Sequence, residues 1–156
     1  MRWLARWWPT ILWAIVIATF STSSFSSDDT ARFIVPFLHW ILPFAQEHLL
    51  EALHHVIRKG AHVGEYFVLG IFILRGIRAG RHEMRLAWAL AAIAAVAVYA
   101  ALDELHQGFA PGRDPEFSDV LLDTSGGALA QAVAFLVLRR RRTGQAQQAN
   151  ETPSEK

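Results

Sequence analysis

Three short segments of the sequence concentrate ionisable and amide side chains that could bind a polar ligand or move a proton. The members that share a helical spacing are Lys59, His62 and Tyr66; Asp103, His106 and Gln107; and Asp119 and Asp123. Residues three, four or seven positions apart lie on one face of a helix. Glu65 and Glu104 lie within the first two segments, and Arg113 follows a Pro-Gly turn between the second and the third.

Acid–base chemistry is the first function that these residue types suggest. His62 or His106, oriented by Asp103 or Asp119, could donate or accept a proton, so these four residues are the catalytic candidates. Lys59 and Arg113 could bind a phosphate or a carboxylate. The remaining binding candidates are Glu65, Tyr66, Glu104, Gln107 and Asp123. The chain has 0 Cys and lacks a G-x-S-x-G elbow, so the familiar nucleophile signatures are absent and enzymatic activity stays open.

Two other interpretations use the same residues. His62 begins an H-x-x-E motif and Asp103 begins a D-x-x-H motif, and both motifs contain metal-ligand types. Lys59 and Arg113 would repel a cation, however, and we predict no metal site. The sequence does not indicate a cofactor. The second interpretation is an ion-pair network in which opposite charges hold helix ends together.

Four apolar stretches are expected to position these groups. Hydrophobic residues make up 53% of the chain and charged residues 19%, which favours a membrane protein. The net charge of +1 argues against a nucleic-acid-binding surface. The stretches with no more than one charged residue cover 7–27, 60–74, 86–102 and 124–138. The last three reach the roughly 20 residues that cross a bilayer only by including ionisable neighbours at one end.

The basic residues predict the topology of these four spans. Ten of the 15 lie in 2–6, 75–85 and 139–142, next to span ends. By the positive-inside rule both termini are cytoplasmic, and the three polar segments lie at the outer ends of spans two to four. A cleaved signal peptide is the alternative for the first stretch, but three further apolar stretches favour a retained span.

The region between the first two spans is expected to lie on the outer leaflet. Apolar residues at helical spacing predict an amphipathic surface helix over 46–57. Pro36 and Pro43 are expected to break the apolar stretch 33–44, so it is not predicted to be a fifth span.

The polar segments resemble the VanZ-like family. The matching stretches are Arg58-Lys59-Gly60-Ala61-His62-Val63-Gly64-Glu65-Tyr66, Asp103-Glu104-Leu105-His106-Gln107, Pro111-Gly112-Arg113, Ser118-Asp119-Val120 and Gly126-Gly127. The resemblance covers most of residues 7–138. It implies a small polytopic membrane protein whose named member confers low-level resistance to the glycopeptide teicoplanin, but it supplies no mechanism.

The sequence therefore predicts an all-α, polytopic membrane protein with four transmembrane helices and an outer-leaflet amphipathic helix between the first two. Residues 1–142 are expected to form a membrane domain in a bacterial inner membrane, and residues 143–156 a disordered, polar cytoplasmic tail.

The functional hypothesis is an outward-facing polar pocket that binds or processes an anionic cell-envelope component or an amphiphilic glycopeptide, and thereby contributes to antibiotic resistance. Membrane lipid is the other expected partner, and nucleic acid is not one. The alternative is a non-catalytic structural or assembly protein. Four short spans without a repeat or a broken helix do not favour a transporter.

Overall fold

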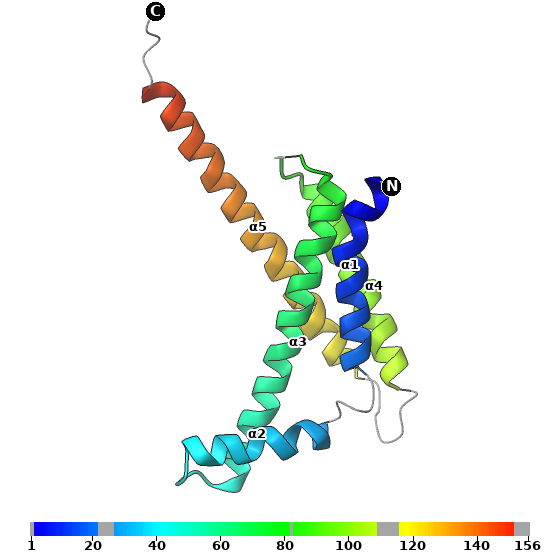
Figure 1. Cartoon of the computed structure of the whole chain (residues 1–156), viewed down its shortest axis with the longest axis vertical. Coiled ribbons are helices and arrows are strands. Elements are labelled where there is room, and N and C mark those ends of the chain that lie inside the picture. The colour runs from blue at the N-terminus through cyan, green and yellow to red at the C-terminus, as the bar shows by residue number, and fades with distance from the viewer. Residues whose placement is uncertain (1, 22–26, 82, 109–115, 152–156) are drawn as a thin grey trace, which may run out of the picture.

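The computed structural model describes residues 2–21, 27–81, 83–108 and 116–151 (Figure 1). These residues form five helices: α1 (Arg2–Phe20), α2 (Ser27–Ile41), α3 (Glu47–Arg78), α4 (Leu86–Gln107) and α5 (Phe117–Glu151). Of these, α1, α3, α4 and α5 are long and apolar enough to cross a membrane. The predicted all-α class with four spans is therefore confirmed.

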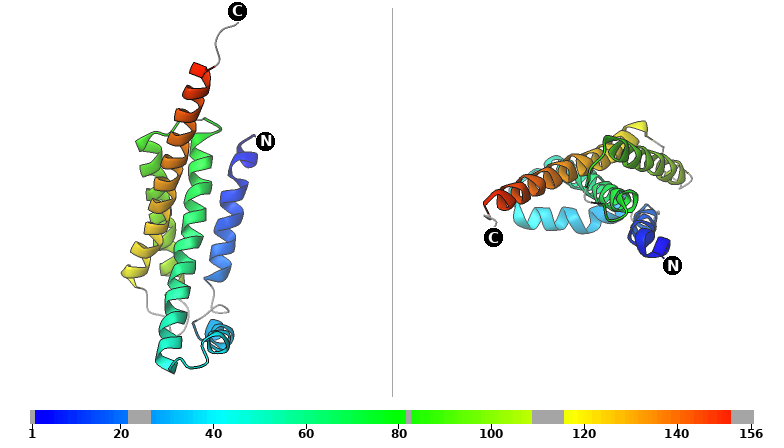
Figure 2. Two further views of the ribbon diagram at one scale, coloured as in Figure 1. Left: turned by 90° about the vertical axis from the view of Figure 1, so that its left-hand side faces the viewer. Right: turned by 90° about the horizontal axis from the view of Figure 1, so that it is seen from above.

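Helix α3 is the central element of the bundle. It packs most extensively against α5 and also contacts α1, α4 and α2. Helices α1, α3 and α4 run alongside one another, and α5 crosses α3 obliquely (Figure 1). The start of α1 and the end of α5 lie at the same end of the bundle, and α2 lies across the opposite end (Figures 1 and 2). An even number of spans accounts for this placement of the two ends.

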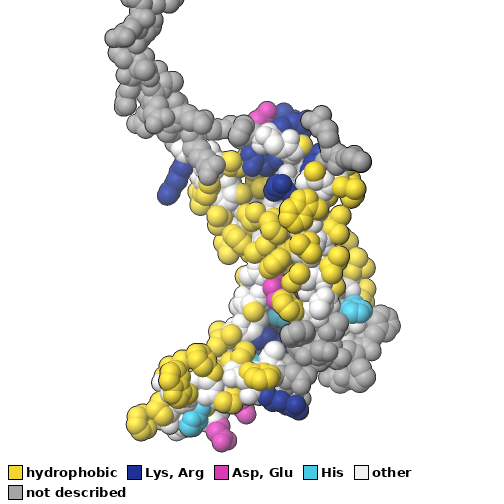
Figure 3. All heavy atoms as spheres, in the orientation of Figure 1, with side chains coloured by type: hydrophobic (Ala, Val, Ile, Leu, Met, Phe, Trp, Pro, Cys, Tyr) yellow, Lys and Arg dark blue, Asp and Glu magenta, His cyan; other side chains and the backbone are white. Residues whose placement is uncertain are grey.

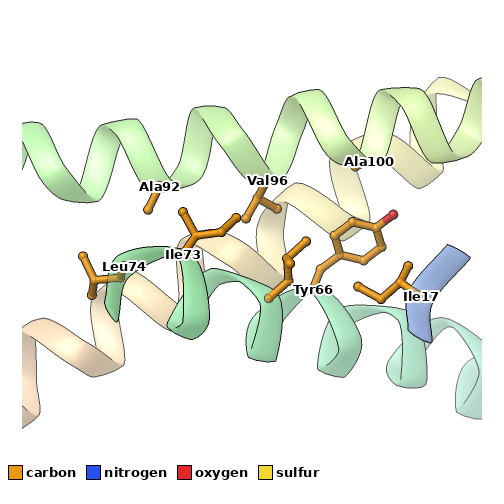
Figure 4. Packing of buried hydrophobic residues seen from close by; sticks show 8 residues of the cluster. Ile17, Tyr66, Ile73, Leu74, Ala92, Val96 and Ala100 are labelled. Atoms are coloured by element: carbon orange, nitrogen blue, oxygen red, sulfur yellow. The ribbon is translucent and has the colours of Figure 1, made fainter. Parts of the chain in front are cut away.

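Large side chains of α1 and α3 pack against the smaller side chains of α4 in the core. The core cluster consists of Ile17, Tyr66, Leu69, Ile73, Leu74, Ala92, Val96 and Ala100 (Figure 4). Between transmembrane helices, alanine and glycine allow close backbone approach, and van der Waals contact replaces the hydrophobic driving force. The outward-facing side chains are large and apolar, for example Ile15, Leu90 and Val98, as lipid contact requires.

The crossing of α3 and α5 depends on three glycines. A Cβ atom on Gly126 would lie 2.3 Å from the backbone oxygen of Val63, and one on Gly127 would lie 2.7 Å from Cγ1 of Val96. A Cβ on Gly70 would lie 3.1 Å from the Cα of Gly127. Gly126 and Gly70 therefore allow the close approach of α3 and α5, and Gly127 allows that of α5 and α4.

The sequence predicts a separate amphipathic surface helix over 46–57, but nearly all of these residues belong to the helix of the second span. Residues 47–57 form the first three turns of α3, which continues unbroken for 32 residues. No proline separates this segment from the span, and Gly60 and Gly64 do not end the helix. The separate helix between the spans is α2, which tolerates Pro36 in its interior and is too short, at 15 residues, to cross a bilayer.

Helix α5 extends beyond the fourth span. It continues to Glu151, into the segment 143–156 for which the sequence predicts a disordered tail. Gln and Ala, which are frequent in this segment, are good helix formers, and a helix already nucleated in the span extends readily into such a sequence. The division into a membrane domain and a tail stays a prediction.

Basic side chains gather at the end of the bundle that holds the termini (Figure 3). Arg6 of α1 donates to the carbonyl oxygens of Gly76 and, at 2.9 Å, Ile77 at the end of α3. The guanidinium of Arg85 lies 4.9 Å from the ring centroid of Trp88, a cation–π contact suited to a membrane interface.

This distribution yields a topology prediction. Reporters fused after residue 142 or inserted within 79–85 should report a cytoplasmic location, and reporters inserted within 42–46 should report an external one. The reason is that segments rich in basic residues stay on the cytoplasmic side of the membrane. Alkaline phosphatase and fluorescent-protein fusions measure this directly. An externally accessible C-terminal tag would contradict the four-span arrangement.

Candidate functional site

The polar segments of α3, α4 and α5 meet near the end of the bundle opposite to the basic side chains. Lys59 precedes Arg75 by 16 residues, and Asp119 precedes Arg139 by 20. At about 1.5 Å per residue these separations correspond to about 24 and 30 Å along the helix axes. Hydrocarbon is roughly 30 Å thick, so the polar groups lie in the half of the membrane that is remote from the basic end.

The outermost contact joins α3 to α5. Lys59 Nζ lies 3.3 Å from Asp119 Oδ1, and both side chains are about two-fifths exposed. The pair is thus accessible from one side rather than sealed in the bundle. Exposed pairs of this kind contribute only about 0–1 kcal/mol to stability.

A second contact lies one helical turn further into the bundle. His62 Nδ1 is 4.0 Å from Asp123 Oδ1, an ion-pair distance that exceeds a hydrogen bond. The Asp123 side chain is 7% exposed, whereas that of His62 is 27% exposed. Among the described residues, Asp123 Oδ1 has no hydrogen-bond partner.

The innermost contacts surround Asp103 of α4. Tyr66 donates its hydroxyl to Asp103 Oδ2 at 3.2 Å, and Gln107 donates through Nε2 to the same oxygen at 2.9 Å. All three side chains are buried. Two neutral donors therefore offset part of the cost of burying one carboxyl group.

Glu104 joins the start of α5 to the end of α4. Its Oε1 accepts a hydrogen bond of 2.7 Å from the backbone N–H of Glu116, just before α5 begins. A carboxylate at a helix N-terminus is stabilised by the unpaired N–H groups and by the helix dipole. Glu104 thus has a structural role in closing the connection between the two helices.

Comparison with known protein families covers the part of the chain that holds the polar segments. The family model described as VanZ/LLP1 matches residues 7–138, which take in most of each of the four long helices and every polar segment. This chain belongs to the VanZ/LLP1 family. No curated protein and no solved structure matches the chain.

Not every predicted site residue of this VanZ/LLP1 chain joins the cluster. His106 is exposed on α4, whereas its neighbour Gln107 is buried. Glu65, by contrast, is half-buried and lies close enough to Asp103 and Asp123 to interact with them, and its backbone oxygen accepts a hydrogen bond of 2.9 Å from Trp13 of α1. Arg113 lies outside the described residues.

Two further polar residues of the VanZ/LLP1 fold were not among the candidates. Tyr99 donates to the carbonyl oxygen of Ala14, and its ring centroid lies 6.2 Å from that of Tyr66. Gln131 is buried beside the glycine crossing and donates to the carbonyl oxygen of Gly70 at 3.2 Å. A polar residue inside an uncharged run, as Gln131 is, was the signal available in the sequence.

The cluster does not have the geometry of a metal centre. In the part of the chain that the structure describes, no three His, Asp or Glu residues converge closely enough to hold an ion. The arrangement instead provides alternating acids and donors across three helices. Such a set can bind a headgroup with several polar atoms, or pass a proton between neighbours.

Proposed function

We propose that this VanZ/LLP1 protein binds the headgroup of an amphiphilic cell-envelope molecule at the polar cluster. The observation that carries the proposal is the buried Asp123, whose Oδ1 lacks a hydrogen-bond partner among described residues while Lys59 and Asp119 above it remain half-exposed. Charged groups within a membrane are costly and usually mark a ligand or ion pathway. The candidate ligands are an anionic lipid, a cell-wall precursor and an amphiphilic glycopeptide antibiotic.

Each part of the cluster has a distinct role in this proposal. Lys59 binds an anionic group of the ligand at the outer surface, and Arg113 is the second cation available from the sequence. His62 and Asp123 bind or exchange a proton with the remainder of the headgroup. Asp103, held by Tyr66, forms the polar floor. Among the two candidate proton carriers, the contact to Asp123 favours His62 over His106.

A structural function is the second candidate, and it has its own support. Each of the three contacts joins two different helices: Lys59 to Asp119, His62 to Asp123, and Tyr66 to Asp103. In this alternative the cluster only fixes the relative positions of α3, α4 and α5, and the protein serves in assembly.

Exchanging the charges of Lys59 and Asp119 separates the two candidates. The Lys59→Asp variant should lose binding to an anionic headgroup by about tenfold, because a charge-assisted hydrogen bond contributes roughly 1.5–3 kcal/mol. Adding Asp119→Lys should restore any lost stability without restoring binding, since the cation then lies on α5. Retention of phosphatidylglycerol by purified protein, measured by native mass spectrometry, reports binding, and the thermal midpoint reports stability.

The exposed Arg85–Glu83 pair at the opposite end provides the matched control. Its exchange, Arg85→Glu with Glu83→Arg, should leave lipid retention and stability unchanged, because both side chains are at least half-exposed. Recovery of phosphatidylglycerol retention in the Lys59/Asp119 exchange would favour the structural function. If expression of the wild type protects cells from teicoplanin, the variants should rank in the same order for protection as for phosphatidylglycerol retention.

A further inference from the structure

The polar cluster brings several carboxyl groups close together. The side chains of Asp103, Asp119, Glu104 and Glu65 all lie close enough to Asp123 to interact with it electrostatically. Lys59 is paired with Asp119 at 3.3 Å, and Nδ1 of His62 lies 4.0 Å from Asp123 Oδ1. Five carboxyl groups therefore lie close to one another between α3, α4 and α5.

Among these carboxyl groups, Asp123 is the one whose oxygen lacks a donor within the described residues. This residue is 5% exposed, and its Oδ1 makes no hydrogen bond with any part of the chain that the structure describes. The nearest ring nitrogen, Nδ1 of His62, is 4.0 Å away. A buried acceptor without a donor is unfavourable, so Asp123 is suited to accept a hydrogen bond from a bound group.

Asp103, unlike Asp123 Oδ1, has hydrogen-bond donors within the described part of the chain. Its Oδ2 accepts hydrogen bonds from Tyr66 and Gln107, both of which are neutral donors. A ligand is therefore not needed to satisfy Asp103. The demand for a donor lies between α3 and α5, one helical turn below the Lys59–Asp119 pair.

We propose that the headgroup bound at this cluster carries a primary ammonium group, which donates to Asp123 while the adjoining anionic group contacts Lys59. This inference rests on the proposed function and specifies its ligand class. An ammonium supplies three N–H donors and a positive charge among the surrounding acids. A second anionic group at the same position would be repelled by them.

The spacing of the two contacts matches such a headgroup. Lys59 and His62 are one turn apart on α3, as Asp119 and Asp123 are on α5, and one turn rises about 5.4 Å. A phosphate joined to an ammonium through two carbons spans a comparable length. Phosphatidylethanolamine has this chemistry, and so does its free headgroup, phosphoethanolamine.

Lipid preference of the purified full-length wild type tests the inference without any substitution. We expect phosphatidylethanolamine to be retained at least about tenfold more than phosphatidylcholine, whose quaternary ammonium has no N–H donor, in native mass spectrometry from mixed micelles. Phosphatidylglycerol should bind through its phosphate with intermediate strength. Equal retention of all three would overturn the ammonium assignment but leave headgroup binding intact, and retention of none would overturn both.

Substitution of Asp123 tests whether this residue causes the preference for phosphatidylethanolamine over phosphatidylcholine. The Asp123→Asn variant keeps the side-chain shape and should lose the preference for phosphatidylethanolamine over phosphatidylcholine while keeping its phosphatidylglycerol binding. The exposed carboxylate at the other end gives the control, Glu83→Gln, which should behave as wild type. A preference that survives Asp123→Asn would overturn the assignment. Competition by phosphoethanolamine would indicate that the headgroup alone is recognised, whereas its failure would assign recognition to the intact lipid.

Discussion

Replacing Gly126 with alanine is expected to disrupt the packing of α3 against α5 and to destabilise the protein by about 3 kcal/mol. The added Cβ would lie 2.3 Å from the backbone oxygen of Val63, and a backbone atom within a helix cannot move aside as a flexible side chain can. Overpacking usually costs roughly 1–3 kcal/mol, and a backbone clash places this variant at the upper end. The thermal midpoint of the detergent-purified protein measures the effect.

Gly64→Ala is the matched control for this substitution. Gly64 also lies within a long helix, but a Cβ there would meet no atom within 4 Å. Alanine is favoured over glycine in a helix by up to about 1 kcal/mol, so this variant should be as stable as wild type or slightly more so. A Gly126→Ala protein with the midpoint of wild type would show that the helices are less tightly packed at this crossing.

Removing the Asp103 carboxyl group is expected to have an effect of similar size. In the Asp103→Ala variant, the Tyr66 hydroxyl and the Gln107 amide lose their buried acceptor. Each unsatisfied buried group costs about 1–3 kcal/mol, so the total loss for the two groups should be about 2–6 kcal/mol. Chemical or thermal unfolding of the purified protein measures this loss.

Two companion variants test the reason for the loss. Asp103→Asn retains an acceptor oxygen for Tyr66 and Gln107 and should therefore be much milder than Asp103→Ala. Combining Asp103→Ala with Tyr66→Phe removes one of the stranded donors, so the double variant should be more stable than the sum of the single effects predicts. Additive effects, or equal stability of the Asn and Ala variants, would contradict the hydrogen-bonded arrangement around Asp103.

The number of spans and the membrane level of the polar segments could be predicted because both depend on the linear arrangement of charge. Short apolar stretches required the ionisable neighbours of three spans to enter the helices at one end, and α3, α4 and α5 indeed hold them there. Basic residues marked the opposite end. Neither inference needed knowledge of how the helices pack.

Which side chains of a helix point into the bundle was harder to predict. Successive helical residues are about 100° apart, so Gln107 lies about 40° to one side of Asp103 and His106 about 60° to the other. Both share a broad face with Asp103, but the bundle covers only the side that holds Gln107. Spacing alone could not decide between them, because the choice depends on where α3 and α5 lie.

The residues at which helices begin and end also could not be read from local sequence patterns alone. The continuity of α3 through residues 47–60 follows from the absence of any helix-ending residue there, whereas amphipathic spacing suggested a separate element. Pro36 and Pro43 are predicted to break the apolar stretch 33–44; α2 continues through Pro36 and ends at Ile41, before Pro43. The close approach of Gly126 to Val63 joins residues 63 positions apart, and no local pattern contains that contact.

Water access to Asp119 is the central requirement of the proposed headgroup site. The natural chain has 0 Cys, so a single introduced thiol is labelled without background. In the Asp119→Cys variant, a membrane-impermeant maleimide added outside sealed cells should label the protein. Leu121→Cys is the control on the same helix, because Leu121 is 57% exposed but faces away from the polar cluster and is expected to contact lipid.

External labelling of these two variants is the most direct test of the account. It predicts rapid modification of Asp119→Cys, little modification of Leu121→Cys, and full modification of both after denaturation, since a thiol in hydrocarbon stays protonated and unreactive. Failure to label Asp119→Cys from outside, with labelling after denaturation, would contradict an outward-facing binding site.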